Sequence, residues 1–291
     1  MGKVYLPAIR MNINITNIGP KEWVDFKGDI SLGLLHALRS IGHDVTMSTN
    51  YFEKKALNII VGSDFLSGMP NILQPLIRSN YDYAVFEVEA FDGSTINHRQ
   101  DFPLGNYQAL LLNAKSIFTP YQHNVETLKE FGWAEKLQYV RWGYFPELQD
   151  DRIGRNRSFT HDGLFFGLAK GARAEKLNFL KTKKNLRVAV VGRQDPIMMK
   201  HYYIANCRWG LNLSSGKDEC FTNPFRLYAM AANDMPILSD PGPDHDGYLT
   251  LCKVASFHDF EQKLREPEPD LEGLRDRVME RPLADNWRGL L

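Results

Sequence analysis

The chain has 291 residues, of which 43% are hydrophobic and 12% aromatic. This length allows two cores, because domains typically run to roughly 100 to 200 residues. Its 35 lysines and arginines balance 35 aspartates and glutamates, whereas proteins that bind mainly through phosphate-backbone attraction are normally more basic, so nucleic acid is not the expected partner. Cys207, Cys220 and Cys252 show no CxxC or Cys/His spacing, which indicates neither a disulfide framework nor a zinc site and predicts free thiols in a reducing cytosol.

The start of the chain, MGKVYLPAIRMNINIT, has no apolar signal-peptide region, and no apolar run approaches the roughly 20 residues that span a bilayer. The Met-Gly start also lacks the Ser or Thr that a myristoylation signal requires. We therefore expect a cytoplasmic protein without a lipid anchor.

The first half of the chain has the rhythm of a parallel α/β sheet. Residues 10–18 alternate apolar and polar side chains, which predicts a strand. A helix is predicted from Asp29, as its cap, to Gly42, as its left-handed terminator. Further strands are predicted at residues 44–48, 57–61, 83–88, 116–119 and 137–140. Strands separated by helix-length segments predict a Rossmann-like domain over residues 1–150.

Residues 146–162 are polar and aperiodic, which indicates a linker. A second series follows, with strands predicted at 163–166, 186–191, 210–213 and 236–239 and helices near 174–180, 197–205 and 224–232. This series predicts a second Rossmann-like domain over residues 160–265. The remaining residues, 266–291, have helical spacing and are expected to pack back on the first domain.

Candidate ligand-binding residues follow the strands of the second half, because ligands of open parallel sheets bind beyond the carboxyl ends of strands. Gly167, Lys170 and Arg173 combine close backbone approach with positive charge at a helix start, as a pyrophosphate site requires. A solvated basic turn is the alternative. Gly192 could admit a planar base, and Arg193 could stack on it or bond to it.

The loop after residues 210–213 provides a third set of candidates, Ser215, Glu219, Asn223 and Arg226. A carboxylate here can accept both hydroxyls of a ribose, and an arginine in the first turn of the next helix can pair with phosphate. The alternative is that Glu219 caps that helix and Arg226 forms a surface ion pair.

The segment ECFTNPFRLYAMAANDMPILSD, residues 219–240, resembles the donor domain of GT-B glycosyltransferases of the group 1 and capsule or spore-coat type. Glu219 matches the first acidic residue of their signature, and residues 229–231 match its helix. Tyr228 replaces the usual second glutamate, and the spacing is one residue longer. Arg226 resembles the arginine of relatives whose helix reads R-x-x-x-x-x-A-N.

The first half is similar to bacterial and viral members of the same group in NIIVGSDFL, YAVFEVEAF, SIFTPYQHNVETLKEFG and VRWGYFPEL. The resemblance implies a GT-B fold, with two Rossmann-like domains facing each other across a cleft. It also implies transfer of a sugar from a nucleotide-sugar donor, expected to be a UDP-sugar bound as substrate, with no separate cofactor.

Charge neutralisation at the donor phosphates is assigned to Lys170, Arg173 and Arg226, because cations near a helix N-terminus can replace a metal. No DxD pair lies in a metal-loop setting, which predicts a metal-independent enzyme; the DHD sequence at residues 244–246 is a lesser alternative. If the reaction inverts, Glu89 is the predicted general base.

The other candidates for that base are Glu87, expected on the same sheet face as Glu89, and Asp92 and His98. His123 and Tyr144 are lesser candidates for ligand contact. The expected acceptor is a glycan, lipid-linked or small-molecule hydroxyl. The alternatives are a hydroxymethylated DNA base, a catalytically silent nucleotide- or carbohydrate-binding scaffold, and a two-lobed binding protein, which the absence of an export signal disfavours.

Overall fold

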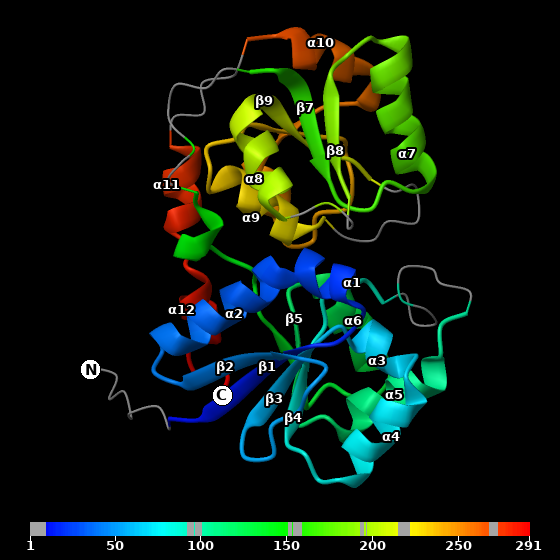
Figure 1. Cartoon of the computed structure of the whole chain (residues 1–291), viewed down its shortest axis with the longest axis vertical. Helices are drawn as coiled ribbons and strands as arrows, with labels where there is room; N and C mark the ends of the chain where they lie inside the picture. The colour runs from blue at the N-terminus through cyan, green and yellow to red at the C-terminus, as the bar shows by residue number, and fades with distance from the viewer. Residues whose placement is uncertain are drawn as a thin grey trace. The chain divides into compact units, whose positions relative to one another are not determined.

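A computed structural model describes residues 10–91, 96, 101–150, 153, 159–192, 195, 197–214, 222–267 and 273–291 (Figure 1). The chain forms two compact units. The first contains residues 10–20, 30–141 and 283–291, and the second contains residues 21–29 and 142–282. Each unit has its own parallel sheet, so the chain is an α/β protein.

The sheet of the first unit has the strand order β2-β1-β3-β4-β5-β6, and its described strands all pair in parallel. Its strands are β1 (Asn12–Asn17), β2 (Asp44–Thr49), β3 (Leu57–Val61), β4 (Tyr83–Phe86), β5 (Ile117–Thr119) and β6 (Leu137–Tyr139). The helices of this unit are α2 (Gly28–Ser40), α3 (Ser63–Ser67), α4 (Pro70–Arg78), α5 (Leu104–Asn113), α6 (Gln122–Glu130) and, at the end of the chain, α12 (Leu283–Trp287). Helix α1 (Lys21–Phe26) and the first two residues of α2 belong to the second unit.

Burial along these strands follows from their sequences. Every residue of β3 and of β4 is buried, as expected for apolar strands that are covered on both faces. The edge strand β2 is mostly exposed or half-buried. The predicted terminator of α2 is confirmed, since Gly42 has a φ of 101° and its N–H donates to the carbonyl of Arg39. Asp29, the predicted cap, lies instead in the first turn of α2.

The last helix of the chain belongs to the first unit. Trp287 of α12 is fully buried, with its ring centroid 6.0 Å from that of Phe86 and 4.7 Å from that of Phe118. Aromatic pairs at these distances add to the stability gained from burial. The preceding helix, α11 (Leu274–Met279), contacts α9 (Pro224–Ala231) in the second unit.

The sheet of the second unit has the order β11-β10-β9-β7-β8, again with parallel pairing of the described strands. Its strands are β7 (His161–Phe166), β8 (Val188–Val191), β9 (Cys207–Asn212), β10 (Ile237–Ser239) and β11 (Lys253–Val254). Its other helices are η1 (Pro146–Leu148), α7 (Gly171–Asn178), η2 (Phe179–Lys183), α8 (Ile197–Asn206), η3 (Tyr248–Leu251), η4 (Phe257–Asp259) and α10 (Phe260–Arg265).

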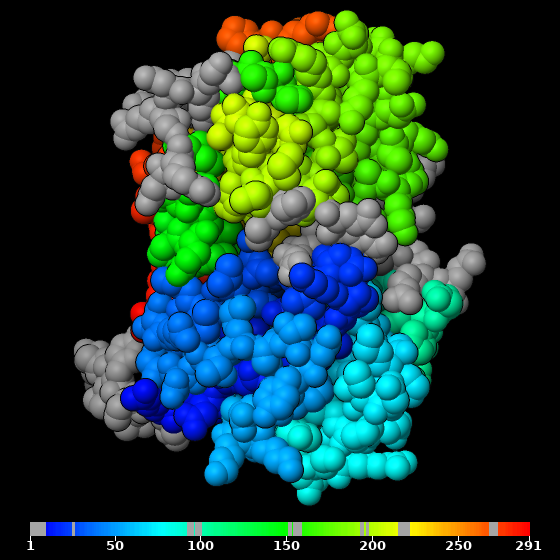
Figure 2. Space-filling model, in the orientation of Figure 1, coloured from blue at the N-terminus to red at the C-terminus, as the bar shows by residue number. Residues whose placement is uncertain are grey.

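Helix α8 shows how this sheet is covered. It contacts β7, β8 and β9, and its opposite side is exposed at Met198 and Tyr202. Figure 2 shows this helix (yellow) at the surface of the chain. Helix α8 therefore covers one face of this sheet and presents its other side to solvent.

Both sheets have the same strand order at their start. Counted in chain order within each unit, the first five strands are arranged 2-1-3-4-5. The second strand is added on one side of the first strand and the later strands on the other side, so the strand order reverses between β1 and β3 in the first unit and between β7 and β9 in the second. In open α/β sheets, ligands bind beyond the carboxyl ends of the strands at this reversal.

Candidate functional site

Arg226 lies at the centre of the site in the second unit, in the first turn of α9. The Asn223 side chain caps this helix by accepting a hydrogen bond from the Arg226 backbone N–H at 3.1 Å. The Arg226 guanidinium donates from Nε to the Phe166 carbonyl at 2.8 Å and from Nη1 to Asn212 Oδ1 at 3.0 Å. The guanidinium carbon, Cζ, lies 4.7 Å from the ring centroid of Phe165. The ends of β7 and β9 therefore hold this guanidinium in one orientation.

Gly167 lies directly after β7, and because it has no side chain it leaves space for the Arg226 guanidinium. Its φ is 139°, which L side chains rarely adopt, and a Cβ there would lie 2.7 Å from Arg226 Nη2. Because the guanidinium is bonded at two other nitrogens, it could not move away without losing those bonds. Glycine is therefore required at this position for both conformation and space.

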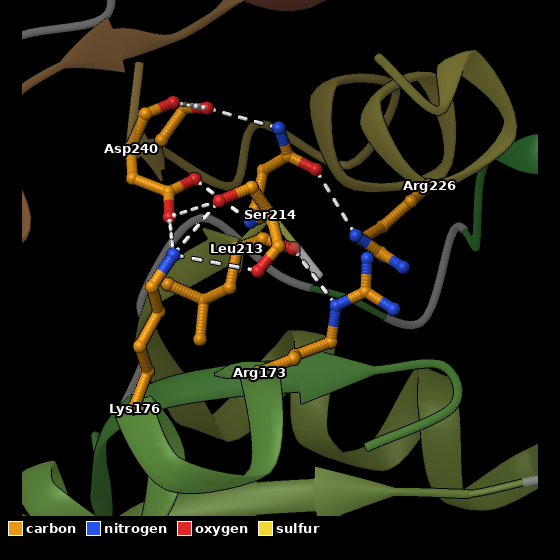
Figure 3. Close-up of polar contacts among 8 residues, drawn as sticks. Arg173, Lys176, Leu213, Ser214, Arg226 and Asp240 are labelled. Carbon is orange, nitrogen blue, oxygen red and sulfur yellow. Dashed lines mark hydrogen bonds and ion pairs between the residues drawn. The ribbon is translucent and has the colours of Figure 1, made fainter. Parts of the chain in front are cut away.

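Four further side chains surround the same strand ends (Figure 3). Arg173 of α7 donates from Nε to the Leu213 carbonyl at 2.8 Å and from Nη1 to the Leu168 carbonyl at 3.0 Å. Lys176, one turn further along α7, bonds the Ser214 hydroxyl at 2.8 Å and forms an ion pair with Asp240. Asp240 accepts hydrogen bonds from the Ser214 N–H at 2.8 Å and the Ser214 hydroxyl at 2.9 Å.

We name this group the β7–β9 site: Gly167, Arg173, Lys176, Asn212, Ser214, Arg226 and Asp240. It lies at the carboxyl ends of β7, β9 and β10, and the strand order of the second sheet reverses between β7 and β9. Its charged members are three cations and one carboxylate. Arg226 is 7% exposed and Asp240 5%, so these two charges lie where solvent screening is weak. Such a site suits a negatively charged ligand.

The structure brings together some of the predicted ligand-binding residues. Gly167, Arg173 and Arg226 meet in the β7–β9 site, and Asn223 adjoins it as the cap of α9. Lys170 is exposed at the N-cap of α7, and the Gly192 N–H donates to the Asp195 carboxylate at 2.7 Å in an exposed turn. Arg193, Ser215 and Glu219 lie outside the described residues.

The alternative that Arg226 forms a surface ion pair is wrong, because its side chain is buried and bonded to the ends of β7 and β9. Tyr228, which replaces the second glutamate of the resembled signature, is fully buried beside Tyr248. Its side chain therefore fills the interior of the unit, so it does not take the place of a ligand-binding carboxylate.

Sequence reasoning missed Lys176, Asn212, Ser214 and Asp240. Asp240 directly follows β10, so the rule that selected the loops after the other strands would have selected it too. Lys176 carried a weaker signal, since it follows Arg173 by one helical turn and therefore lies on the same face of α7.

In the first unit, the predicted base Glu89 is half-buried in the segment after β4. Strand β4 ends at Phe86, so the alternation that was expected to place Glu87 and Glu89 on one sheet face does not continue to Glu89. Glu87 is fully buried and accepts hydrogen bonds from the Ser63 hydroxyl at 2.5 Å, the Tyr107 hydroxyl at 2.9 Å and the Glu89 N–H at 3.0 Å. Asp92 and His98 lie outside the described residues.

Burial raises the pKa of Glu87 to about 7, and repulsion from Asp64 acts in the same direction. The three hydrogen bonds to its carboxylate oppose this shift. Glu87 therefore changes charge near neutral pH inside the first unit.

The remaining candidates take structural positions. His123 Nε2 lies 3.2 Å from the Phe91 carbonyl, and the Tyr144 N–H donates to the Arg281 carbonyl at 2.9 Å. Within the described ranges, no group of three His, Cys, Asp or Glu residues is placed to hold a metal ion. No helix there is long and apolar enough to cross a bilayer.

Two Rossmann-like units, each with a parallel sheet whose first five strands are arranged 2-1-3-4-5, are the building blocks of a GT-B fold, and this part of the predicted fold class is confirmed. A glycosyltransferase involved in avilamycin A biosynthesis aligns with a TM-score of 0.57 at 10% identity, over 95% of this chain and 96% of that chain. An alpha-glucosyltransferase in complex with UDP aligns with a TM-score of 0.52 at 10% identity, over 96% of each chain.

An alpha-glucosyltransferase in complex with UDP and a 13-mer DNA containing a central A:G mismatch aligns with a TM-score of 0.51 at 11% identity, over 94% of each chain. No protein-family model matches the sequence, and no curated protein sequence matches it either. At this level of identity, the similarity describes the fold.

Proposed function

We propose that the protein is a glycosyltransferase that binds a nucleotide-sugar donor, expected to be a UDP-sugar, at the β7–β9 site. The observation that carries this proposal is the buried Arg226, held between the ends of β7 and β9 against Gly167. The GT-B fold and the UDP bound to a similar alpha-glucosyltransferase support it. The donor is a substrate here, and no further cofactor is required.

The cations of the site match the chemistry of the donor. When the bond between the sugar and the diphosphate breaks, negative charge builds up on the leaving phosphate and the anomeric carbon becomes cation-like. Arg226 and Arg173 would stabilise that charge, and the N–H groups at the start of α7, directly beyond the Gly167 loop, would add to it. Hydrogen bonds to the Leu213 and Phe166 carbonyls and to Asn212 orient the two guanidiniums.

Glu89 is the proposed general base for an inverting reaction, in which a carboxylate removes the proton of the acceptor hydroxyl. The proposed acceptor is a glycan, lipid-linked or small-molecule hydroxyl. A DNA base is the second candidate, because one similar alpha-glucosyltransferase is bound to DNA. The zero net charge of the chain favours the first.

The decisive experiment compares UDP binding and sugar release in wild type, Arg226→Lys, Arg173→Ala and Glu219→Ala. Arg226→Lys keeps the charge but cannot reproduce both guanidinium bonds. Arg187→Ala is the control, because it removes a 65% exposed arginine just before β8, at the other end of the strands. UDP affinity is measured by calorimetry, and sugar release with UDP-, GDP- and CMP-sugars.

We expect at least a tenfold loss of UDP affinity or of release rate in Arg173→Ala and Arg226→Lys, and wild-type behaviour in Arg187→Ala. Unchanged affinity and rate in both site variants would remove the β7–β9 site from the proposal. Nucleotide binding without sugar release or transfer from any donor would favour the silent scaffold. A salt-dependent mobility shift with hydroxymethylated duplex DNA would favour the DNA acceptor.

A further inference from the structure

The segment that follows β4, residues 87–91, has its main chain fixed by side chains on both sides. The Glu89 N–H donates to Glu87 Oε1 at 3.0 Å, and the Glu89 carbonyl accepts from Asn124 Nδ2 at 2.7 Å. The Phe91 N–H donates to Asn124 Oδ1 at 3.0 Å. The Asn124 amide therefore bonds the segment at two places, once as a donor and once as an acceptor.

The two residues that hold this segment are themselves fixed. Glu87 is fully buried and bonded to Ser63 of α3 and Tyr107 of α5. Asn124 is fully buried in the first turn of α6, and its Nδ2 also lies 3.2 Å from Thr119 Oγ1, at the end of β5. Elements on several sides of β4 therefore converge on one short segment.

The backbone N–H and carbonyl groups of surface loops ordinarily form hydrogen bonds with water. Burying a carboxylate and an amide to hold a loop is costly unless every polar group is paired, and here Glu87 and Asn124 both bond directly to the main chain of Glu89. A catalytic group needs this kind of support, because misplacement by about 1 Å can lower a rate on the order of 100-fold.

We propose that Glu87 and Asn124 are positioning residues that fix the main chain at Glu89 and thereby place its carboxylate for proton removal from the acceptor. This proposal rests on the function proposed above, with Glu89 as the base. It assigns to the buried pair a role in the transfer step and none in binding the donor nucleotide.

The test separates the two halves of the Asn124 amide. Asn124→Asp keeps the size of the side chain and an acceptor for the Phe91 N–H, but it replaces the donor to the Glu89 carbonyl with an oxygen. Glu87→Gln keeps an acceptor for the Glu89 N–H, whereas Glu87→Ala removes it. Asn113→Ala is the control, because the exposed Asn113 amide donates to the Ala109 carbonyl within one helix.

Each variant is made alone and combined with Glu89→Gln, and kcat, KM for the donor and UDP affinity are measured. We expect Asn124→Asp and Glu87→Ala to lower kcat by roughly 10- to 100-fold with UDP affinity unchanged. Glu87→Gln and Asn113→Ala should stay within about threefold of wild type. In the Glu89→Gln background the losses should shrink to less than about threefold, because there is no base left to position.

Losses of equal size with and without Glu89 would overturn the positioning role, as would Glu89→Gln transferring at the wild-type rate. A parallel fall in UDP affinity would show a general loss of structure and would overturn it as well. If wild type neither binds nucleotide nor transfers sugar, the proposed function fails first and takes this inference with it. If wild type binds nucleotide and transfers sugar, but the Glu87 and Asn124 variants lose as much activity without Glu89 as with it, only the positioning role is overturned and the proposed function stands.

Discussion

Replacing Glu87 with glutamine should change how the stability of the first unit depends on pH. In wild type, burial raises the pKa of Glu87 from 4.5 to about 7, which corresponds to a difference of about 3 kcal/mol between the folded and unfolded proteins. Below pH 4.5 the group is protonated in both states, and its contribution to stability is fully present. As the pH rises the unfolded chain loses its proton first, so stability falls and levels off once the pH passes about 7.

Glutamine does not titrate, so Glu87→Gln should lack this fall. Between about pH 5 and about pH 8, the free energy of unfolding of the variant should rise relative to wild type by about 2 to 3 kcal/mol. Hydrogen bonds that the amide loses or gains change the free energy of unfolding by the same amount at every pH. The part of the difference that varies with pH therefore reports the charge of Glu87 alone.

Unfolding of two units need not be a single transition. Denaturant-dependent hydrogen exchange of the buried amides in β3 and β4 therefore measures the first unit by itself. Glu130→Gln, which removes an exposed carboxylate at the end of α6, is the control. A difference between Glu87→Gln and wild type that stays constant across this pH range would refute the reasoning.

Three other outcomes are expected. Gly167→Ala should weaken UDP binding at least tenfold by calorimetry, because the methyl group meets Arg226 Nη2 and the φ of 139° is strained; wild-type affinity would contradict the described fit. Asn223→Ala should lower the free energy of unfolding by about 1 kcal/mol in denaturant titrations, through loss of the α9 cap, and no loss would argue against the cap. Sugar transfer should continue in excess EDTA, whereas recovery only on adding Mg²⁺ or Mn²⁺ would contradict metal independence.

The sequence located part of the β7–β9 site because of one regularity. Carboxyl ends of parallel strands share an edge, so Gly167, Arg173 and Arg226 could be selected one loop at a time without any pairing information. Lys176 could not be placed in this way, because its meeting with Asp240 depends on how α7 sits against the end of a strand 64 positions further along the chain. Such contacts require strand order and register, which apolar periodicity does not specify.

The role of Glu87 was hidden for a related reason. The run YAVFEV has the apolar character of a continuing strand, although β4 ends at Phe86. From sequence alone, a carboxylate at the end of such a run is expected to be exposed to solvent, because its hydrogen-bond partners cannot be identified. Those partners, Ser63 and Tyr107, lie 24 and 20 positions away and belong to different helices. Only the packed structure shows that the carboxylate is buried.

The contacts that hold Arg226 have a consequence for the kinetics of binding. An arginine side chain carries about 2 kcal/mol of rotamer entropy, and a flexible arginine would lose much of it when a ligand is captured. Here bonds to the Phe166 carbonyl and to Asn212 impose that order as the second unit folds. A phosphate would then meet a guanidinium already in place, so side-chain rearrangement at Arg226 should not limit the association rate.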